Sequence, residues 1–229
     1  MVRAMLCDIR DMSENLIRTM SGQITARIRE KILTGVYPPG SALLQDVIAA
    51  EFGVSKIPVR EALVQLRAEG LVDVFAHRGF QVRPLSSREV DEVFRLRSQI
   101  EPAAVAEGSR RAQAEDHDAT RLAFGNLNDA LAAGELYESG DLNRAFHIAL
   151  IVPRLQPVTA EVLSRLHTLS QRYVRMHLLP PGRVKRATQE HTDLYEAWIA
   201  GNTDEAVRLT HSHIETTRGD LAQLLQSPK

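Results

Sequence analysis

The stretch from Phe52 to Gly70 constrains the fold most, because one short segment carries helix-terminating residues, two cations and an apolar stripe. Ser55 can cap the first free backbone amides of a helix, and Pro58 suits a first turn, where its missing N–H costs nothing. Gly70 can end the helix. Apolar residues recur at intervals of three and four, namely Val59, Ala62, Leu63 and Leu66. The spacing predicts a short helix with one buried face.

Two cations mark the N-terminal end of this predicted helix. Lys56 and Arg60 lie four residues apart and outside the apolar stripe. The same end of a recognition helix meets base edges in a major groove of DNA. In an isolated helix, Arg60 would more simply be a solvated charge paired with Glu61 or a neighbour. The elements on either side of the helix favour a role for Arg60 in DNA recognition.

The flanking segments predict a winged helix. Upstream, apolar periodicity indicates one helix that ends near Gly35 and a short second helix that is closed by Gly53. Two short helices joined through a glycine turn are typical of a helix-turn-helix. Downstream, residues 71–74 and 80–83 alternate apolar and polar around residues 76–79, which predicts a β-hairpin with glycine at its tip. We therefore expect three helices and a basic hairpin wing.

Four motifs follow one another in this region, namely Tyr37–Leu43, Val54–Leu63, Glu69–Leu71 and Arg78–Val82. In content and order they resemble the N-terminal domain of GntR-family bacterial transcription regulators. The resemblance implies a dimer on a short palindromic operator in double-stranded DNA, with the wing in the minor groove. The residues that it assigns to DNA contact are Ser55, Lys56, Pro58 and Arg60 on the helix, and His77, Arg78 and Gly79 on the wing.

The motifs depart from the family pattern at two positions. Lys56 stands where arginine is usual, and Gln45 stands where an acidic residue is usual. Lysine keeps the charge but loses the planar, two-pronged donor that fits guanine. Base specificity at this position should therefore differ from that of the arginine-containing members.

Composition is compatible with a cytoplasmic DNA-binding protein of two domains. The chain has 229 residues, of which 44% are hydrophobic, a single cysteine and a net charge of −1. Residues 21–84 hold eight Lys or Arg and six Asp or Glu, a charge of +2, so the remainder carries −3. We expect no membrane span and no secretory signal, because no apolar run is long enough.

The rest of the chain has a helical period throughout. Ser86 and Glu89 form a capping-box motif that opens a new helix, so we expect the boundary near residue 85. Helices are predicted at about 87–111, 114–133, 139–152, 157–178, 184–200 and 203–225, and they are separated by glycines and prolines. The expected fold is mainly α, with a flexible arm (1–20), a winged helix-turn-helix (21–85) and an all-α bundle of six or seven helices (86–229) for effector binding and dimerisation.

Several polar side chains in the bundle have the spacing of metal ligands. Asn143 and His147 are four residues apart on one helical face, so both can meet one ion. His191 and His213 lie on the last two helices, which a short turn makes antiparallel neighbours. Taken singly, a histidine is more often a surface or core residue than a metal ligand. We expect such a surface or core role for His117, His167, His177 and His211.

The bundle segment contains the motifs Arg97-x-x-x-Glu101, Asn143-x-x-Phe146-His147, Glu190-His191 and Ala197-x-x-x-Gly201-Asn-x-x-x-Ala206, followed by His213. These motifs resemble the C-terminal ligand-binding (FCD-type) domain of the FadR-type branch of the GntR family. The resemblance implies one divalent ion that positions a small organic acid effector, with Asn143, His147, His191 and His213 as ligands. Asparagine in place of aspartate should weaken the hold on the ion. Zinc, nickel, manganese and iron all suit this donor set.

A carboxylate effector needs cationic partners besides the ion. Arg97 is the first candidate and Arg172 the second. An intrahelical pair of Arg97 with Glu101 or Glu92 is an equal alternative. The chain after the Phe146-His147 helix is also shorter than usual for the family, which should reshape the pocket.

The expected function is a ligand-responsive, sequence-specific repressor or activator of transcription. A metal-dependent enzyme would need a placed general base beside the histidines, and no catalytic motif is present, so we do not expect an enzyme. A third alternative is a regulator whose metal-free bundle serves only for dimerisation.

Overall fold

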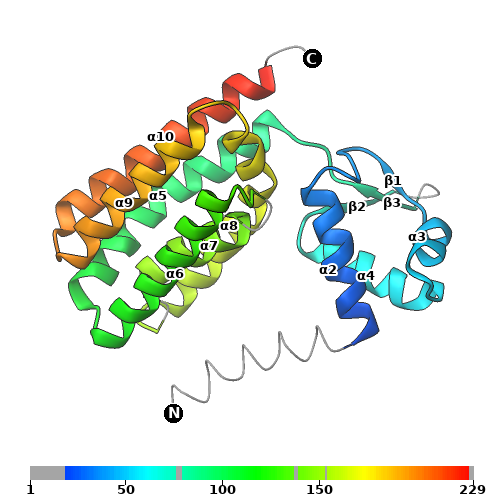
Figure 1. Cartoon of the computed structure of the whole chain (residues 1–229), viewed down its shortest axis with the longest axis horizontal. Helices are drawn as coiled ribbons and strands as arrows, with labels where there is room; N and C mark the ends of the chain where they lie inside the picture. Colours follow the sequence, from blue (N-terminus) through cyan, green and yellow to red (C-terminus); the bar gives the residue numbers. More distant parts are fainter. Residues whose placement is uncertain (1–18, 76–78, 137–138, 153, 227–229) are drawn as a thin grey trace. The chain divides into compact units, whose positions relative to one another are not determined.

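The computed structural model describes residues 19–75, 79–136, 139–152 and 154–226. Their contacts separate into two units, one that ends at Pro84 and one that begins at Leu85. Among the described residues, the first unit contains short helices around a small sheet, and the second contains long helices alone (Figure 1). The chain is therefore mainly α, as predicted.

The first unit is a winged helix-turn-helix. Its elements are α2 (Met20–Leu33), β1 (Ala42–Leu43), α3 (Gln45–Phe52), α4 (Lys56–Ala68), β2 (Val72–Phe75) and β3 (Gly79–Val82). Gly53 ends α3 in the left-handed conformation (φ 66°), which lets the chain turn directly into α4. The strands form an antiparallel sheet in the order β1-β3-β2.

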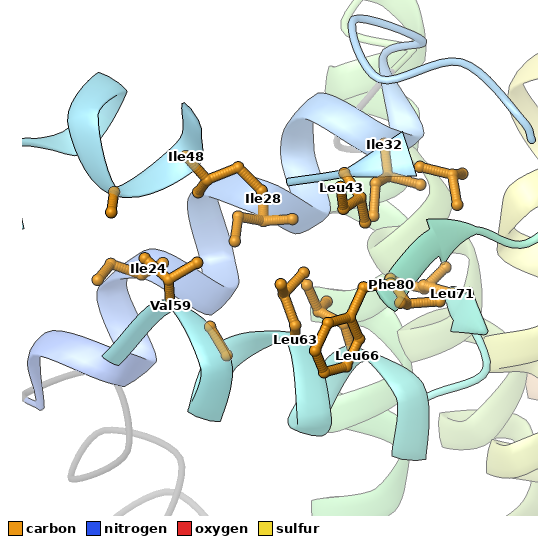
Figure 2. Close-up of a cluster of buried hydrophobic side chains, with 14 residues drawn as sticks. Ile24, Ile28, Ile32, Leu43, Ile48, Val59, Leu63, Leu66, Leu71 and Phe80 are labelled. Atoms are coloured by element: carbon orange, nitrogen blue, oxygen red, sulfur yellow. The ribbon is translucent and has the colours of Figure 1, made fainter. Parts of the chain in front are cut away.

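Figure 2 shows the apolar core of this unit, in which α2, α3, α4 and the sheet all take part. Ile28, Val59 and Leu63 have no exposed surface. The stripe predicted on α4 is the buried face of that helix, and it leaves Lys56 and Arg60 on the exposed side. Apolar burial of this kind contributes about 1.5–3 kcal/mol for each large side chain.

In this unit one strand was not predicted and one local expectation was wrong. β1 was not predicted, because two residues are too short to show an alternating pattern. Ser55 does occupy the N-cap position of α4 in an extended conformation, but its side chain makes no cap hydrogen bond. The expected hairpin is present, with its strands one residue away from their predicted positions.

The second unit is an all-α bundle, and each of the six predicted helices is found within two residues of its expected bounds. Ser86 caps the first helix by accepting a hydrogen bond from the amide of Glu89 at 3.3 Å. The helices are α5 (Ser87–Arg111), α6 (Ala114–Ala133), α7 (Ser139–Ile151), α8 (Pro157–Leu178), α9 (Arg183–Ile199) and α10 (Thr203–Gln226). No helix of the described chain is long and apolar enough to cross a membrane.

Close backbone packing holds α7 against its neighbours. A Cβ built on Gly108 of α5 would lie 2.1 Å from the carbonyl oxygen of Leu150, so only glycine fits there. The same oxygen accepts a hydrogen bond from the indole of Trp198 on α9 at 2.9 Å. Val152, just after α7, has a positive φ of 54°, which is a strained conformation for a β-branched residue. The short connection noted in the sequence thus ends α7 abruptly against α5 and α9.

Candidate metal centre and DNA-contacting residues

The helix α4 presents its predicted DNA-contacting residues at its N-terminal end. Lys56 is the first helical residue, and Arg60 follows one turn later on the same exposed side. Lys56 forms an ion pair with Asp46 of α3, and both side chains are about two-thirds exposed (66% and 70%). Exposed pairs of this kind contribute little to stability, so Lys56 can exchange this partner for a phosphate.

The remaining residues assigned to DNA surround these cations or lie on the wing. Ser55 is exposed and Pro58 is half-buried. Gly79 begins β3 with a φ of 74° and is exposed. His77 and Arg78 lie outside the described residues.

Three histidines from α7, α9 and α10 meet inside the bundle. Nitrogen atoms of His147, His191 and His213 all lie within 4.8 Å of one another. The three residues are 0%, 3% and 9% exposed. Two nitrogens that bind one zinc ion at about 2.1 Å lie no more than about 4.2 Å apart, so small side-chain rotations bring this group to one ion. The predicted meeting of these histidines is present in the structure.

The nitrogens of this cluster fit a metal ion better than a purely structural role. Both ring nitrogens of His191 and Nε2 of His147 are buried without a hydrogen-bond partner in the protein. Burial lowers the pKa of His147 to about 3 and that of His191 well below its usual value, so both rings are neutral. A neutral imidazole nitrogen without a partner has a free lone pair that can bind a metal ion. The nitrogens of a core histidine, by contrast, normally have hydrogen-bond partners.

Carboxylates lie behind two of the three histidines. Oε1 of Glu101 lies 2.7 Å from Nδ1 of His147, and Oε2 of Glu190 lies 2.7 Å from Nδ1 of His213. Each carboxylate favours the tautomer with its proton on Nδ1, which leaves Nε2 free to bind an ion. Metal-binding histidines commonly have this kind of support. Glu101 was not expected here, because its spacing from Arg97 predicts only an intrahelical ion pair.

Glu101 is the centre of a buried charge network that sequence reasoning missed in part. Arg97 donates to it from Nε at 2.9 Å, which confirms the intrahelical alternative, and Nε2 of His167 lies 3.1 Å away. Burial would raise the pKa of Glu101, but Arg97, His167 and His147 together hold it well below its usual range. His167, taken from the sequence as a surface or core residue, is thus a buried member of the network. Its pKa falls to about 4 through burial.

Glu101, His147 and His167 are themselves close enough to form a second group of possible ligands. The guanidinium of Arg97 already neutralises this carboxylate, so an added ion would meet a fixed positive charge. The group is better explained as the support of His147.

A small cavity of about 30 Å³ lies beside the histidine cluster. Asn143 lines it one turn before His147, where its side-chain oxygen can serve as the predicted fourth ligand. Arg97 also lines the cavity, whereas Arg172 does not and instead lies 3.7 Å from Glu89. The residues around the cavity are Phe94, Arg97, Leu127, Leu131, Ser139, Asn143, Val174, His177, Leu178, Ala187, His191, His213, Ile214 and Thr217.

The other histidines have separate surroundings. His177 lines the cavity, and burial lowers its pKa to about 4. His117 packs its ring edge-on against Trp198, and His211 is exposed. His117 and His211 have the surroundings expected from the sequence, and His167 and His177 are both buried in the bundle.

Together, the fold and the buried cluster define a class of protein: a winged helix-turn-helix joined to a helical bundle with an internal polar site. Comparison with known families is specific. Residues 20–82 match the family described as bacterial regulatory proteins, gntR family, and residues 92–216 match the FCD domain. The chain belongs to the GntR family of bacterial regulators, and its helical bundle is an FCD domain.

Individual relatives agree with this assignment. An HTH-type regulator, BphR of Paraburkholderia xenovorans, is 28% identical over 209 residues, which cover 88% of this chain and 84% of BphR. The HTH-type transcriptional repressor GlaR of Escherichia coli is 27% identical over 198 residues, or 82% and 90% of the two chains. The solved structure of E. coli McbR/YncC has the same fold, with a TM-score of 0.73 at 21% identity over 91% of this chain and 99% of that one. The protein is a DNA-binding transcriptional regulator and not an enzyme.

Proposed function

We propose that this regulator is a homodimer that binds a short palindromic operator and responds to a small carboxylate through a divalent metal ion in its bundle. The observation that carries the proposal is the group of three buried imidazoles, in which Nε2 of His147 and both ring nitrogens of His191 have no partner in the protein. A bundle that served only for dimerisation would have no need of such a group.

Asn143, His147, His191 and His213 would hold the ion. When bound, a divalent ion of the zinc, nickel, manganese or iron type supplies open coordination positions to a carboxylate. Asn143 contributes a neutral oxygen, so the protein's four ligands carry no formal charge, and the site keeps the full charge of the ion for an anionic effector. Arg97 adds a further positive charge at the cavity wall, although Glu101 already accepts its hydrogen bonds.

DNA contact is proposed for the N-terminal end of α4 and the wing. Lys56 and Arg60 approach base edges or phosphates, Ser55 and Pro58 pack the start of the helix against the DNA backbone, and the wing segment His77–Gly79 enters the minor groove. Affinity should fall steeply with added salt, because phosphate contacts release counterions. Since the operator is chromosomal, the proposed place of action is the bacterial cytoplasm.

Regulation is proposed to be a coupling between two sites. If the effector changes the affinity for DNA, the DNA changes the affinity for the effector by the same factor. GlaR is named a repressor. We propose the same direction here, with the acid releasing the operator.

The test uses full-length protein and a duplex selected from a randomised DNA library. Fluorescence anisotropy measures the affinity of the zinc-loaded protein for this duplex with and without a panel of organic acids. At least one acid should change Kd by a factor of about five or more. The double variant His147→Ala/His191→Ala should bind the same duplex but show no response. An acid response that survives in the double variant would contradict the proposal, as would a lack of response to every acid. Sedimentation analysis should give the mass of a dimer.

A further inference from the structure

Thr217 stands out among the residues that line the cavity. It lies on α10 one turn beyond His213, it is 7% exposed, and its hydroxyl has no hydrogen-bond partner. The other lining hydroxyl, that of Ser139, already donates to the carbonyl oxygen of Leu136 at 2.8 Å. A buried hydroxyl without a partner costs free energy, so Thr217 is arranged for a polar group that enters the cavity.

The cavity walls beyond the histidines are largely apolar. Seven of its fourteen lining residues are hydrophobic, and they include Leu127, Leu131, Leu178 and Ala187. Ala187 precedes His191 by one turn on α9, and Ser139 precedes His147 by two turns on α7, so the cavity wall includes residues beyond the cluster itself. An apolar tail in this space would be removed from water and stabilised.

The residues that line the cavity provide no second permanent cation for a further acidic group. Among the residues that line the cavity, Arg97 alone carries a permanent positive charge, and its guanidinium donates a hydrogen bond to Glu101. Arg183 and Arg186 are near the same end of the bundle, but both pair with Asp220 and neither lines the cavity. A second carboxylate would therefore meet the neutral imidazole of His177 but no permanent charge of opposite sign, and burying it there is unfavourable.

The size of the cavity sets an upper limit on the ligand. A single water needs roughly 10–15 Å³ of such space, whereas pockets for drug-sized ligands reach about 300–1,000 Å³. The cavity of about 30 Å³ suits a ligand of a few heavy atoms beside the ion.

We infer that the effector is a short aliphatic monocarboxylate, whose carboxylate accepts a hydrogen bond from Thr217 and whose tail contacts the apolar wall. The inference rests on the proposed function, because it assumes that the histidine cluster holds an ion that receives the acid. It adds Thr217 to the site and excludes dicarboxylates and polyhydroxy acids as preferred effectors.

Calorimetric titration of the zinc-loaded full-length protein tests this inference. Butyrate and succinate form a matched pair of four-carbon acids that differ in one end group, and gluconate represents polyhydroxy acids. Butyrate should bind about tenfold or more tightly than either. Stronger binding of succinate or gluconate would overturn the inference and leave the carboxylate-sensor proposal standing. If zinc binds but no acid does, both fail.

A pair of isosteric variants tests the role of Thr217. Thr217→Val should weaken butyrate binding by about tenfold while the zinc content stays unchanged. Thr210→Val is the control, because Thr210 is buried on the same helix but donates to the carbonyl oxygen of Ala206 and does not line the cavity. Equal butyrate affinity in the Thr217 variant and in the wild type would overturn the assignment.

Discussion

Oε1 of Glu101 lies 2.7 Å from Nδ1 of His147, and both side chains are completely buried. Because Glu101 is ionised and His147 is neutral, this contact places the ring proton on Nδ1 and aims the lone pair of Nε2 at the histidine cluster. Arg97 compensates the buried carboxylate on the same helix. The charge pair on α5 thus acts on the proposed metal site through His147.

The first prediction concerns this contact. Glu101→Gln should weaken zinc binding by about 10- to 100-fold, which is the usual effect of losing the partner behind a metal-binding histidine. Competition with a chromophoric chelator measures the affinity, and circular dichroism verifies the fold. Glu107→Gln, an exposed change on the same helix at a residue paired with Arg111, should have no effect. Equal zinc affinity in both variants would show that Glu101 does not support the site.

The second prediction concerns the oxygen donor. Asn143→Asp should tighten metal binding on the order of tenfold, about 1.4 kcal/mol, because it adds a negative charge beside a cation at a buried position. The same chelator competition measures it. If Asn143 only lines the cavity, the affinity will not change, and the apo protein will instead lose stability from the added buried charge.

The third prediction concerns the Lys56–Asp46 pair. Asp46→Ala should raise the affinity for non-operator DNA and steepen its salt dependence, because it frees Lys56 and removes a carboxylate that repels phosphates. Anisotropy titrations of a random-sequence duplex at several salt concentrations measure both quantities. Asp118→Ala is a matched control, since Asp118 forms an equally exposed ion pair with Arg121 in the bundle. An identical salt slope in wild type and Asp46→Ala would place the pair outside the DNA interface.

The fourth prediction concerns the packing that positions α7. Gly108→Ala should destabilise the protein by about 2–3 kcal/mol, because its Cβ would overlap the Leu150 carbonyl. Gly125→Ala on α6 meets nothing within 4 Å and should stabilise by up to about 1 kcal/mol. Urea denaturation measures both. A Gly108→Ala variant as stable as the wild type would mean that α5 and α7 are not held this closely.

Local signals in the sequence were sufficient to predict most of the fold. Glycines and prolines between periodic segments located all six bundle helices, and the apolar stripe on α4 separated Lys56 and Arg60 from the core. The strand β1 escaped prediction because its two residues pair with β3, far along the chain. Pairing at that distance leaves no local pattern.

Only those site residues that belong to recognisable motifs could be predicted from the sequence. His147, His191 and His213 were expected together and are found together. The contacts of Glu101 with His147 and His167 join residues 46 and 66 positions apart, and nothing in the local sequence distinguishes this glutamate from an ordinary i,i+4 partner of Arg97. The hydroxyl of Thr217 likewise becomes notable only once its missing partner is seen.

The central claim, that the bundle holds a metal ion, is tested most directly by elemental analysis of the purified protein. The protein should be made without a histidine tag and without added chelator, beside the double variant His147→Ala/His191→Ala. We predict close to one equivalent of a divalent metal per chain in the wild type and its loss in the double variant. Absence of metal from both proteins, or equal metal in both, would contradict the claim and reduce the four proposed ligands to cavity and core residues.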